Sequence, residues 1–245
     1  MNGMQCARQA FMRRIRPAPV MFLDYDGTLT DIVMNPEDAI ADDELKDLLL
    51  KVKKRFETYI VTGRGLDDIQ NLLGIDMDII ALHGAVGMIS GKRIDFVPDM
   101  DRYIRICDDL FRSRDDLIRE FPGLRIYNKN GNLLFHFGRL DVSMHESLFH
   151  KVRDIGREAG MDIYLGKLII ELRVPGIDKG ITISRIRAGR NALIAGDDTT
   201  DEEAFRKNSD SLRISVGRKL DGSDCVLPDP ESMRRFLQWA VQIPE

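Results

Sequence analysis

The sequence is poor in cysteine and has no long apolar run. Its 245 residues include three cysteines, Cys6, Cys107 and Cys225, which lie far apart and form no CxxC or CxxH pattern. The sequence therefore predicts neither a disulfide framework nor a zinc site, and sparse free thiols are typical of a reducing compartment. Because no apolar run approaches the roughly 18–20 residues of a membrane span, we expect a cytoplasmic protein that does not associate with membranes.

Basic residues are not in excess either. Lys and Arg together number 36 and Asp and Glu number 40, which gives a net charge of −4. Proteins that bind nucleic acid concentrate positive charge, so we expect no nucleic-acid partner. The hydrophobic fraction of 43% is enough for a sizeable core. At roughly 100–200 residues per domain, the chain holds one large domain or a core with an inserted module.

One segment departs from this charge balance. Residues 1–19 contain four arginines and no acidic residue. A transit peptide would also be rich in arginine, but it would carry serine, which this segment does not. We expect residues 1–19 to form a flexible leader, and we assign it no function.

Short apolar runs alternate with amphipathic helices in two separate parts of the chain. The predicted elements of the first part are strands at 20–23, 58–61 and 79–82 and helices at 43–56 and 66–73. Those of the second part, after Pro175, are a helix from Asp178, a strand at 191–195, edge strands around Ile214 and Val226, and a helix from Pro230. This alternation predicts an α/β fold with a doubly wound parallel sheet.

The residues between these two parts follow a different pattern. After a hairpin centred on Gly91, a helix followed by two strands occurs twice. The predicted elements are helices at 101–121 and 141–159 and strands at 124–127, 133–137, 162–165 and 168–174. We therefore expect a core formed by residues 20–98 and 174–245, with an inserted α+β cap domain, built on an antiparallel sheet, at 99–173.

Acidic residues gather where the predicted core strands end. Asp24 and Asp26 follow the first strand, and Asp197 and Asp198 follow a later one, with Asp201 close behind. Ligands of parallel sheets bind at the carboxyl ends of the strands, and clustered carboxylates repel one another unless something binds between them. Mg²⁺ prefers all-oxygen ligands. The sequence therefore predicts a Mg²⁺ site at this edge of the sheet.

An isolated lysine, Lys179, stands where a predicted helix begins. A lysine there is poorly placed against the helix dipole, which favours a functional role over a solvated surface position. A cation site beside this lysine indicates a phosphate ligand, with Asp24 as a nucleophile rather than only a metal ligand.

At this point four motifs carry a resemblance to a known family. DYDGT at 24–28, VTGR at 61–64, DKG at 178–180 and GDDTTDEEAF at 196–205 resemble the motifs of the haloacid dehalogenase (HAD) superfamily of phosphohydrolases. The insertion resembles the cap of members that act on sugar phosphates. More narrowly, GKLIIELRVPGIDKG at 166–180 and the last motif resemble the trehalose-6-phosphate phosphatases. The resemblance covers about residues 20–240 and implies a HAD-like, Rossmann-like core.

The resemblance also implies a catalytic role for four residues. Asp24 would attack phosphorus, and Asp26 would protonate the departing sugar oxygen and then deprotonate the water that hydrolyses the aspartyl phosphate. Such acid–base assistance is typically worth about 10²–10⁴-fold. Thr62 would hydrogen-bond a phosphoryl oxygen, and Lys179 would neutralise negative charge. The implied Mg²⁺ ligands are Asp24, the backbone carbonyl of Asp26, Asp197 and either Asp198 or Asp201.

Candidate substrate-binding residues lie in both predicted domains. In the core they are Gly63, Arg64, His83 and Gly84, and in the cap they are Lys129, Lys167, Glu171 and Arg173. His83 and Gly84 match the family's HG step, with a structural histidine as the alternative. Lys167 and Glu171 lie four residues apart on a predicted strand and share one face, which suits vicinal sugar hydroxyls; a cross-strand ion pair is the alternative. We expect His136, His145 and His150 to be bystanders.

Together these expectations describe a Mg²⁺-dependent sugar-phosphate phosphatase with trehalose 6-phosphate as the leading substrate. The alternatives are a phosphatase of mannosyl-3-phosphoglycerate or sucrose 6-phosphate, a hexose-phosphate mutase and a non-catalytic phosphosugar sensor. A sensor is disfavoured because Asp24, Asp26, Lys179 and Asp197 are all present. Neither amphipathic stripe is duplicated on a second face, so we expect a monomer.

Overall fold

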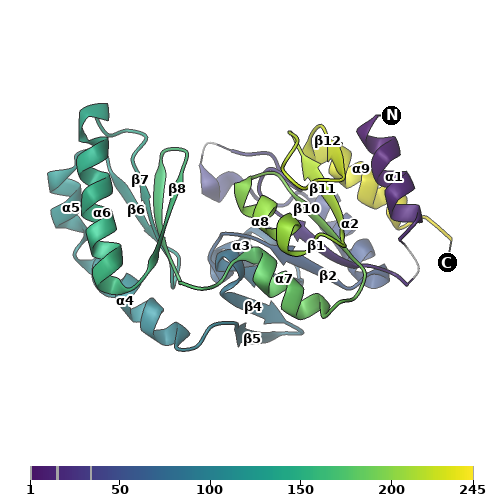
Figure 1. The fold of residues 1–245 in the computed structure, drawn as a ribbon, viewed down its shortest axis with the longest axis horizontal. Coiled ribbons are helices and arrows are strands. Elements are labelled where there is room, and N and C mark those ends of the chain that lie inside the picture. The colour runs from purple at the N-terminus through teal and green to yellow at the C-terminus, as the bar shows by residue number, and fades with distance from the viewer. Residues whose placement is uncertain (1, 15–16, 34, 245) are drawn as a thin grey trace.

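The computed structural model describes residues 2–14, 17–33 and 35–244, which form two β-sheets (Figure 1). The larger sheet has eight strands in the order β12-β11-β10-β1-β2-β3-β4-β5. Its strands are β1 (Val20–Asp24), β2 (Thr58–Val61), β3 (Asp78–Ala81), β4 (Val86–Ile89), β5 (Lys92–Asp95), β10 (Ala192–Gly196), β11 (Leu212–Val216) and β12 (Cys225–Leu227). Neighbours from β12 to β3 are parallel, and β4 and β5 complete the sheet as an antiparallel hairpin.

Helices cover both faces of this sheet. They are α1 (Gly3–Met12), α2 (Asp43–Arg55), α3 (Leu66–Leu73), α7 (Lys179–Arg187), α8 (Thr199–Lys207) and α9 (Pro230–Ala240). Successive side chains of a strand point to opposite faces. Accordingly, Met21 and Leu23 of β1 pack into one apolar cluster with α1, α2, α3 and α9, while Val20 and Phe22 pack into another with α7 and α8. The prediction of an α/β fold with a doubly wound, mainly parallel sheet is confirmed.

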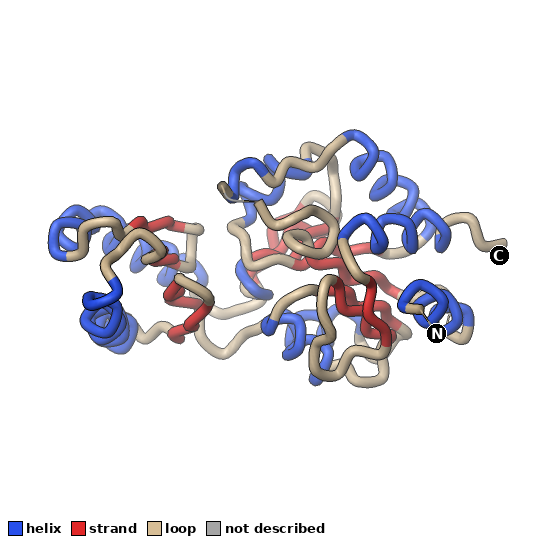
Figure 2. Tube along the Cα trace, turned by 90° about the horizontal axis from the view of Figure 1, so that it is seen from above, coloured by secondary structure: helices blue, strands red, loops and turns tan. Residues whose placement is uncertain are grey.

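The smaller sheet is antiparallel, with the strand order β6-β7-β9-β8. Its strands are β6 (Arg125–Asn128), β7 (Leu133–His136), β8 (Asp162–Gly166) and β9 (Ile169–Arg173), and its helices are α4 (Met100–Arg112), α5 (Arg114–Glu120) and α6 (His145–Ala159). These helices and one face of the sheet share an apolar cluster. Figure 2 shows the two groups of strands, each with its own helices. The other face of the smaller sheet is therefore free to face the larger unit.

The predicted helix at 101–121 is divided in two. One helix ends at Arg112 and the next begins at Arg114, with Ser113 between them. The Ser113 hydroxyl donates to the carbonyls of Asp109 at 3.3 Å and Leu110 at 3.0 Å. Such a side-chain bond competes with the backbone bonds of a helix, so the prediction of one continuous helix is wrong.

The N-terminal segment is not a flexible leader where the structure describes it. Residues Gly3–Met12 form α1, and the side chains of Ala7 and Phe11 are fully buried. The Phe11 ring packs edge-on against Phe56 and Phe236 at centroid distances of 5.9 and 5.6 Å. The prediction was wrong because it rested on composition, whereas these apolar side chains share one side of a helix. Residues 1, 15 and 16 of the predicted leader lie outside the described ranges.

A disulfide bond holds this helix to the large sheet. Cys6 of α1 is bonded to Cys225 of β12, across a sequence separation of 219. The expectation of free thiols is therefore wrong for these two cysteines, because distance along the sequence does not limit which cysteines meet in the fold. Cys107 is a buried free thiol. No helix in the described ranges combines the length and the apolar character that a membrane crossing requires.

Candidate active site

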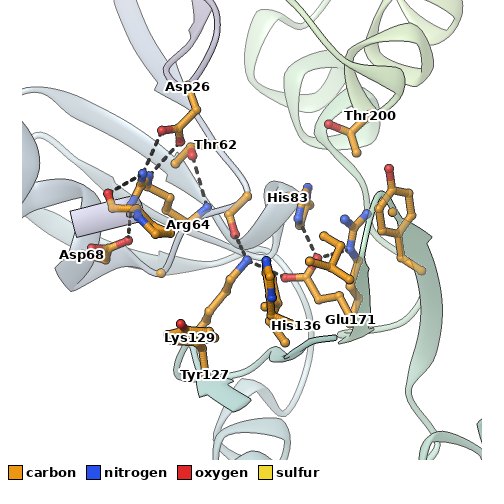
Figure 3. Close-up of a pocket in the computed structure, with 18 of the residues that line it drawn as sticks. Asp26, Thr62, Arg64, Asp68, His83, Tyr127, Lys129, His136, Glu171 and Thr200 are labelled. Atoms are coloured by element: carbon orange, nitrogen blue, oxygen red, sulfur yellow. Dashed lines mark hydrogen bonds and ion pairs between the residues drawn. The ribbon is translucent and has the colours of Figure 1, made fainter. Parts of the chain in front are cut away.

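Asp24, Thr62 and Asp197 meet at one edge of the large sheet. Asp24 ends β1, Thr62 follows β2 and Asp197 follows β10, and β1 lies between the other two strands. The three residues help to line a cavity of about 810 Å³, a size typical of small-molecule sites. The opposite wall of the cavity is the free face of the smaller sheet (Figure 3). The site thus lies where the predicted strand ends placed it.

Lys179 is a buried cation beside Asp24. It is the first residue of α7, and 3% of its surface is exposed. Its Nζ donates to Asp24 Oδ1 at 2.7 Å and to Asp201 Oδ1 at 2.8 Å. Burial alone would lower the pKa of Lys179, but the charges of Asp201 and Asp24 outweigh burial and hold that pKa well above its usual value. Lys179 therefore places a fixed positive charge against one oxygen of Asp24.

Three carboxylates form an acidic cluster around this position. Oxygens of Asp24, Asp197 and Asp201 lie within 4.8 Å of one another. Gly27 makes room for the cluster, since a Cβ there would lie 2.2 Å from Asp197 Oδ2. Burial and the charges of Asp201 and Asp198 raise the pKa of Asp197 to about 7. Lys179 balances only part of the negative charge of the three carboxylates. The remaining charge and the all-oxygen donor set fit a divalent cation.

Asp198 and Asp201 make different hydrogen bonds. Its Oδ1 accepts from the amide of Thr200 at 2.8 Å and from the Thr200 hydroxyl at 2.6 Å, so Asp198 caps the N-terminus of α8. Asp201 Oδ2 accepts from the amides of Asp197 at 3.1 Å and Asp198 at 3.3 Å, and its other oxygen reaches Lys179. Of these two residues, Asp201 belongs to the cluster of carboxylate oxygens and Asp198 does not.

Asp26 and Arg64 form a fork-shaped ion pair. Arg64 Nε donates to Asp26 Oδ2 at 2.7 Å, and Arg64 Nη2 donates to Asp26 Oδ1 at 2.8 Å. Arg64 also bonds Asp68 and the carbonyl of Pro36, both at 2.9 Å. Both residues line the cavity, but the guanidinium predicted to bind substrate is occupied by Asp26. Thr62, 1% exposed, accepts from the Arg64 amide and so belongs to the same local network.

Glu171 gathers positive groups where the small sheet meets the large unit. It is 1% exposed and accepts from Lys129 Nζ and from Arg173 Nε, both at 2.7 Å, while His83 Nε2 lies 3.2 Å away. Lys129 also donates to the Gly63 carbonyl at 3.1 Å. Burial would raise the pKa of Glu171, but Lys129, His83 and Arg173 hold it well below its usual range. Burial lowers the pKa of His83 to about 4, against the opposing effect of Glu171.

Two of the predicted substrate-binding residues, Lys167 and Gly84, do not lie where the sequence predicted. Lys167 lies in the turn between β8 and β9, where Leu168 adopts a φ of 60°, and not on a strand with Glu171. Lys167 does line the cavity, but the ion partners of Glu171 come from elsewhere. Gly84 is not among the described residues that line the cavity. It lets the start of α7 approach, because a Cβ there would lie 2.6 Å from the Asp178 carbonyl.

The structure also brings residues to the cavity that the sequence did not single out. Those on strands of the small sheet include Arg125, Tyr127, Leu134, His136, Tyr164 and Ile169. His136 was expected to be a bystander, but it lines the cavity, so that expectation is wrong about its position. The alternation of side chains along the predicted strands could have indicated this face, because buried apolar residues occupy the positions between.

The chain is similar to known proteins over most of its length. The family model described as trehalose-phosphatase matches residues 22–224. A trehalose-6-phosphate phosphatase-related protein of Thermoplasma acidophilum is 43% identical over 220 residues, which cover 90% of this chain and 96% of that protein.

Solved structures agree with this match. The structure of a trehalose-6-phosphate phosphatase related protein superposes with a TM-score of 0.86 at 42% identity, covering 91% of this chain and 96% of the other. A phosphatase of the haloalkanoate (HAD) enzyme superfamily from Bacteroides thetaiotaomicron has a TM-score of 0.59 at 17% identity, with 91% and 94% coverage. The second likeness shows the shared HAD fold.

Proposed function

The chain belongs to the trehalose-phosphatase family, and from this premise we propose that it hydrolyses trehalose 6-phosphate to trehalose and inorganic phosphate. One observation supports the proposal above the others. A single cavity joins Asp24 and its lysine partner to a wall of polar and aromatic side chains from the small sheet. The first group suits phosphoryl transfer, and the second suits a sugar.

Asp24 is the proposed nucleophile. Lys179 holds Oδ1 of Asp24 at 2.7 Å, which leaves Oδ2 to attack phosphorus. The new bond joins Oδ2 to phosphorus while the bond between phosphorus and the sugar oxygen breaks. Lys179 and Thr62 stabilise the negative charge on the phosphoryl oxygens during this transfer. Water then attacks the aspartyl phosphate, and Asp24 is released as a free carboxylate.

Asp26 is the proposed acid and base. It gives a proton to the departing sugar oxygen and later takes one from the attacking water. Both oxygens of Asp26 accept from Arg64 in the structure. Asp26 therefore has to turn away from Arg64 before it can exchange a proton with the substrate, and Arg64 serves as its resting partner.

Mg²⁺ is the proposed cofactor. Asp24, Asp197 and the backbone carbonyl of Asp26 would hold it, with Asp201 beside them. The ion would supply positive charge to the phosphate and to the crowded carboxylates. The raised pKa of Asp197 supports this assignment, since burial and like charge leave that carboxylate in need of a counter-charge.

Residues 99–173 are the proposed cap of the site. Contacts that join them to the core include Lys129 to the Gly63 carbonyl at 3.1 Å, Glu171 to His83 at 3.2 Å, Tyr164 to Thr199 at 3.0 Å and Asn130 to Asp67 at 3.3 Å. We propose that the cap opens at these contacts to admit substrate and closes to exclude water during transfer.

The remaining assignments follow from the class of substrate. A sugar phosphate is charged and does not cross a bilayer unaided, so we propose that the protein works in the cytoplasm. We further propose that it acts as a monomer, because one chain by itself supplies Asp24, Lys179 and the polar wall of the cavity.

A panel of phosphosugars tests the substrate. We expect phosphate release with Mg²⁺ to be at least about 100-fold faster, as kcat/KM, for trehalose 6-phosphate than for sucrose 6-phosphate, mannosyl-3-phosphoglycerate or glucose 6-phosphate, a discrimination of the size that unpaired polar groups provide. Similar rates for all four substrates would overturn the trehalose assignment. A bisphosphate requirement without net phosphate release would indicate a mutase, and binding without turnover would indicate a sensor.

A further inference from the structure

The face of the small sheet that lines the cavity is organised in two rows. Strand register places one residue from each of the four strands side by side in each row. The near row is Tyr127, Leu134, Glu171 and Tyr164, and the far row is Arg125, His136, Ile169 and Gly166. All eight residues line the cavity. Between the two rows, Ile126, Phe135 and Ile170 belong to the apolar cluster beneath the helices, whereas Leu165 of β8 is exposed.

The two rows lie at different depths relative to the core. Near-row residues bond core side chains, since Glu171 contacts His83 and Tyr164 contacts Thr199. The far-row bonds stay within the small unit: Arg125 Nη2 to His136 Nδ1 at 3.4 Å, and the Gly138 amide to the same nitrogen at 3.3 Å. The far row is therefore the part of this wall that lies farther from the catalytic edge of the large sheet.

The contacts of His136 define which of its nitrogens carries a proton. Both partners of Nδ1 are N–H groups, so Nδ1 accepts and the proton sits on Nε2. Burial and the neighbouring Arg125 lower the pKa of His136, which keeps the ring neutral at pH 7. His136 Nε2 is then a hydrogen-bond donor with no partner among the described residues.

Arg125 is a guanidinium without a counter-charge. Among the described residues it takes part in no ion pair, and its Nε is buried without a hydrogen-bond partner. Buried donors without partners are rare and call for an explanation. Arg125 also lines the cavity, where oxygen acceptors of a bound ligand could pair with the guanidinium N–H groups that face the cavity.

The surroundings of these donors suit a sugar ring more than a simple anion. Ile169 lies beside His136 in the far row, and Tyr127 and Leu134 lie next to the pair in the near row. Apolar and aromatic surface pairs with the C–H face of a pyranose, while a few N–H groups bond its hydroxyls. An isolated anion would gain nothing from this apolar surface.

We propose that the far row is a second sugar-binding site, in which Arg125 and the Nε2–H of His136 donate to hydroxyl oxygens of the ring that carries no phosphate. This inference rests on the proposed function, because it assigns the two rings of the disaccharide to two parts of the wall. The phosphorylated ring lies along the near row, closer to Asp24. The far row then distinguishes a disaccharide phosphate from a monosaccharide phosphate.

The test compares two substrates in the full-length protein with Mg²⁺. Arg125→Ala should lower the ratio of kcat/KM for trehalose 6-phosphate to that for glucose 6-phosphate by about 10- to 100-fold, the loss expected for a bond from a charged donor. His136→Phe should lower this ratio by about 3- to 10-fold, since a neutral donor is weaker. His136→Gln, which keeps an N–H near the place of Nε2, should recover most of it.

Arg112→Ala is the matched control, because Arg112 is exposed on α4 and, among the residues that the structure describes, its side chain pairs only with Asp109 on the same helix. It should leave the ratio at the wild-type value. An unchanged ratio in Arg125→Ala, with hydrolysis of trehalose 6-phosphate intact in the unmodified protein, would overturn the far-row inference alone. Failure of the unmodified protein to hydrolyse trehalose 6-phosphate would overturn the proposed function and this inference together. Equal losses on both substrates in Arg125→Ala would show a structural role and also refute the inference.

Discussion

Removing the Cys6–Cys225 disulfide should cost the protein a large part of its stability. The bond closes a loop over a sequence separation of 219. Loop-closure entropy for a loop of this length amounts to about 5 kcal/mol, and disulfides typically deliver about 2–4 kcal/mol. We therefore expect Cys6→Ser to lower the free energy of unfolding by about 2–5 kcal/mol and the Tm by roughly 5–15 °C.

The helix itself should remain docked in this variant. Phe11 stays fully buried among aromatic rings without help from the disulfide. Figure 1 shows α1 beside α9, at the end of the molecule opposite the small sheet. Turnover at 25 °C should therefore match that of the unmodified protein, and the loss should appear only on heating.

Thermal unfolding followed by circular dichroism, with and without a reductant, measures this effect. Mass spectrometry of a non-reduced digest first establishes that the peptides of Cys6 and Cys225 are joined. The reductant should lower the Tm of the unmodified protein and leave that of Cys6→Ser and of Cys225→Ser unchanged. If the joined protein and its reduced form unfold at the same temperature, the reasoning from loop closure is refuted.

Two further predictions concern the contact between small sheet and core. Glu171→Gln keeps the shape of a side chain that contacts two positive groups, Lys129 and Arg173, and the neutral His83, but it removes the negative charge. It should lower kcat/KM for trehalose 6-phosphate by about 10- to 100-fold and affect p-nitrophenyl phosphate, which has no sugar hydroxyls, far less. Equal losses on both substrates would show Glu171 to be structural. The pKa of His83 is lowered to about 4, so the unfolded chain binds a proton there below about pH 6.5 and the folded chain does not. The stability that this site contributes is complete above about pH 6.5 and declines as the pH falls toward 4. In denaturant titrations, the free energy of unfolding of His83→Gln should decline less steeply over this pH range than that of the unmodified protein. The same decline in both proteins would contradict the lowered pKa of His83.

The core of the site could be predicted from sequence because its residues follow buried strands. Asp24 is the last residue of a short apolar strand, and Asp197 directly follows another. The carboxyl ends of adjacent parallel strands lie side by side at the same edge of the sheet, so these two residues come together. Lys179 was identified as an isolated lysine at a helix start, where the helix dipole disfavours positive charge. These inferences needed only strand order and local charge, and the distances of 2.7 and 2.8 Å from Lys179 to Asp24 and Asp201 agree with them.

Other features depended on contacts between distant segments, which composition does not encode. The arginines at the N-terminus obscured a helix whose Ala7 and Phe11 are buried, and nothing in the spacing of Cys6 and Cys225 indicated that they meet. The pairing of Arg64 with Asp26 is similar, since 38 residues separate them along the chain.

The cap residues show an intermediate case. Their strands were expected at nearly the observed positions, yet the four-residue spacing of Lys167 and Glu171 was misleading because a turn at Leu168 lies between them. The position of His136 on the cavity wall follows from the alternation of side chains along a strand. That inference also requires knowing that the opposite face of the strand is buried, which the structure shows.

Phosphate release from trehalose 6-phosphate by the unmodified protein and by Asp24→Asn, in the same Mg²⁺ buffer, tests the central claim most directly. The amide keeps the shape of the carboxylate but is a far poorer nucleophile. We expect the unmodified protein to release phosphate and trehalose in equal amounts, and Asp24→Asn to release less than about one-thousandth as much, the scale on which loss of a catalytic nucleophile is felt. Should Asp24→Asn retain a few per cent of the unmodified rate, Asp24 would not be the nucleophile and the covalent mechanism would be contradicted.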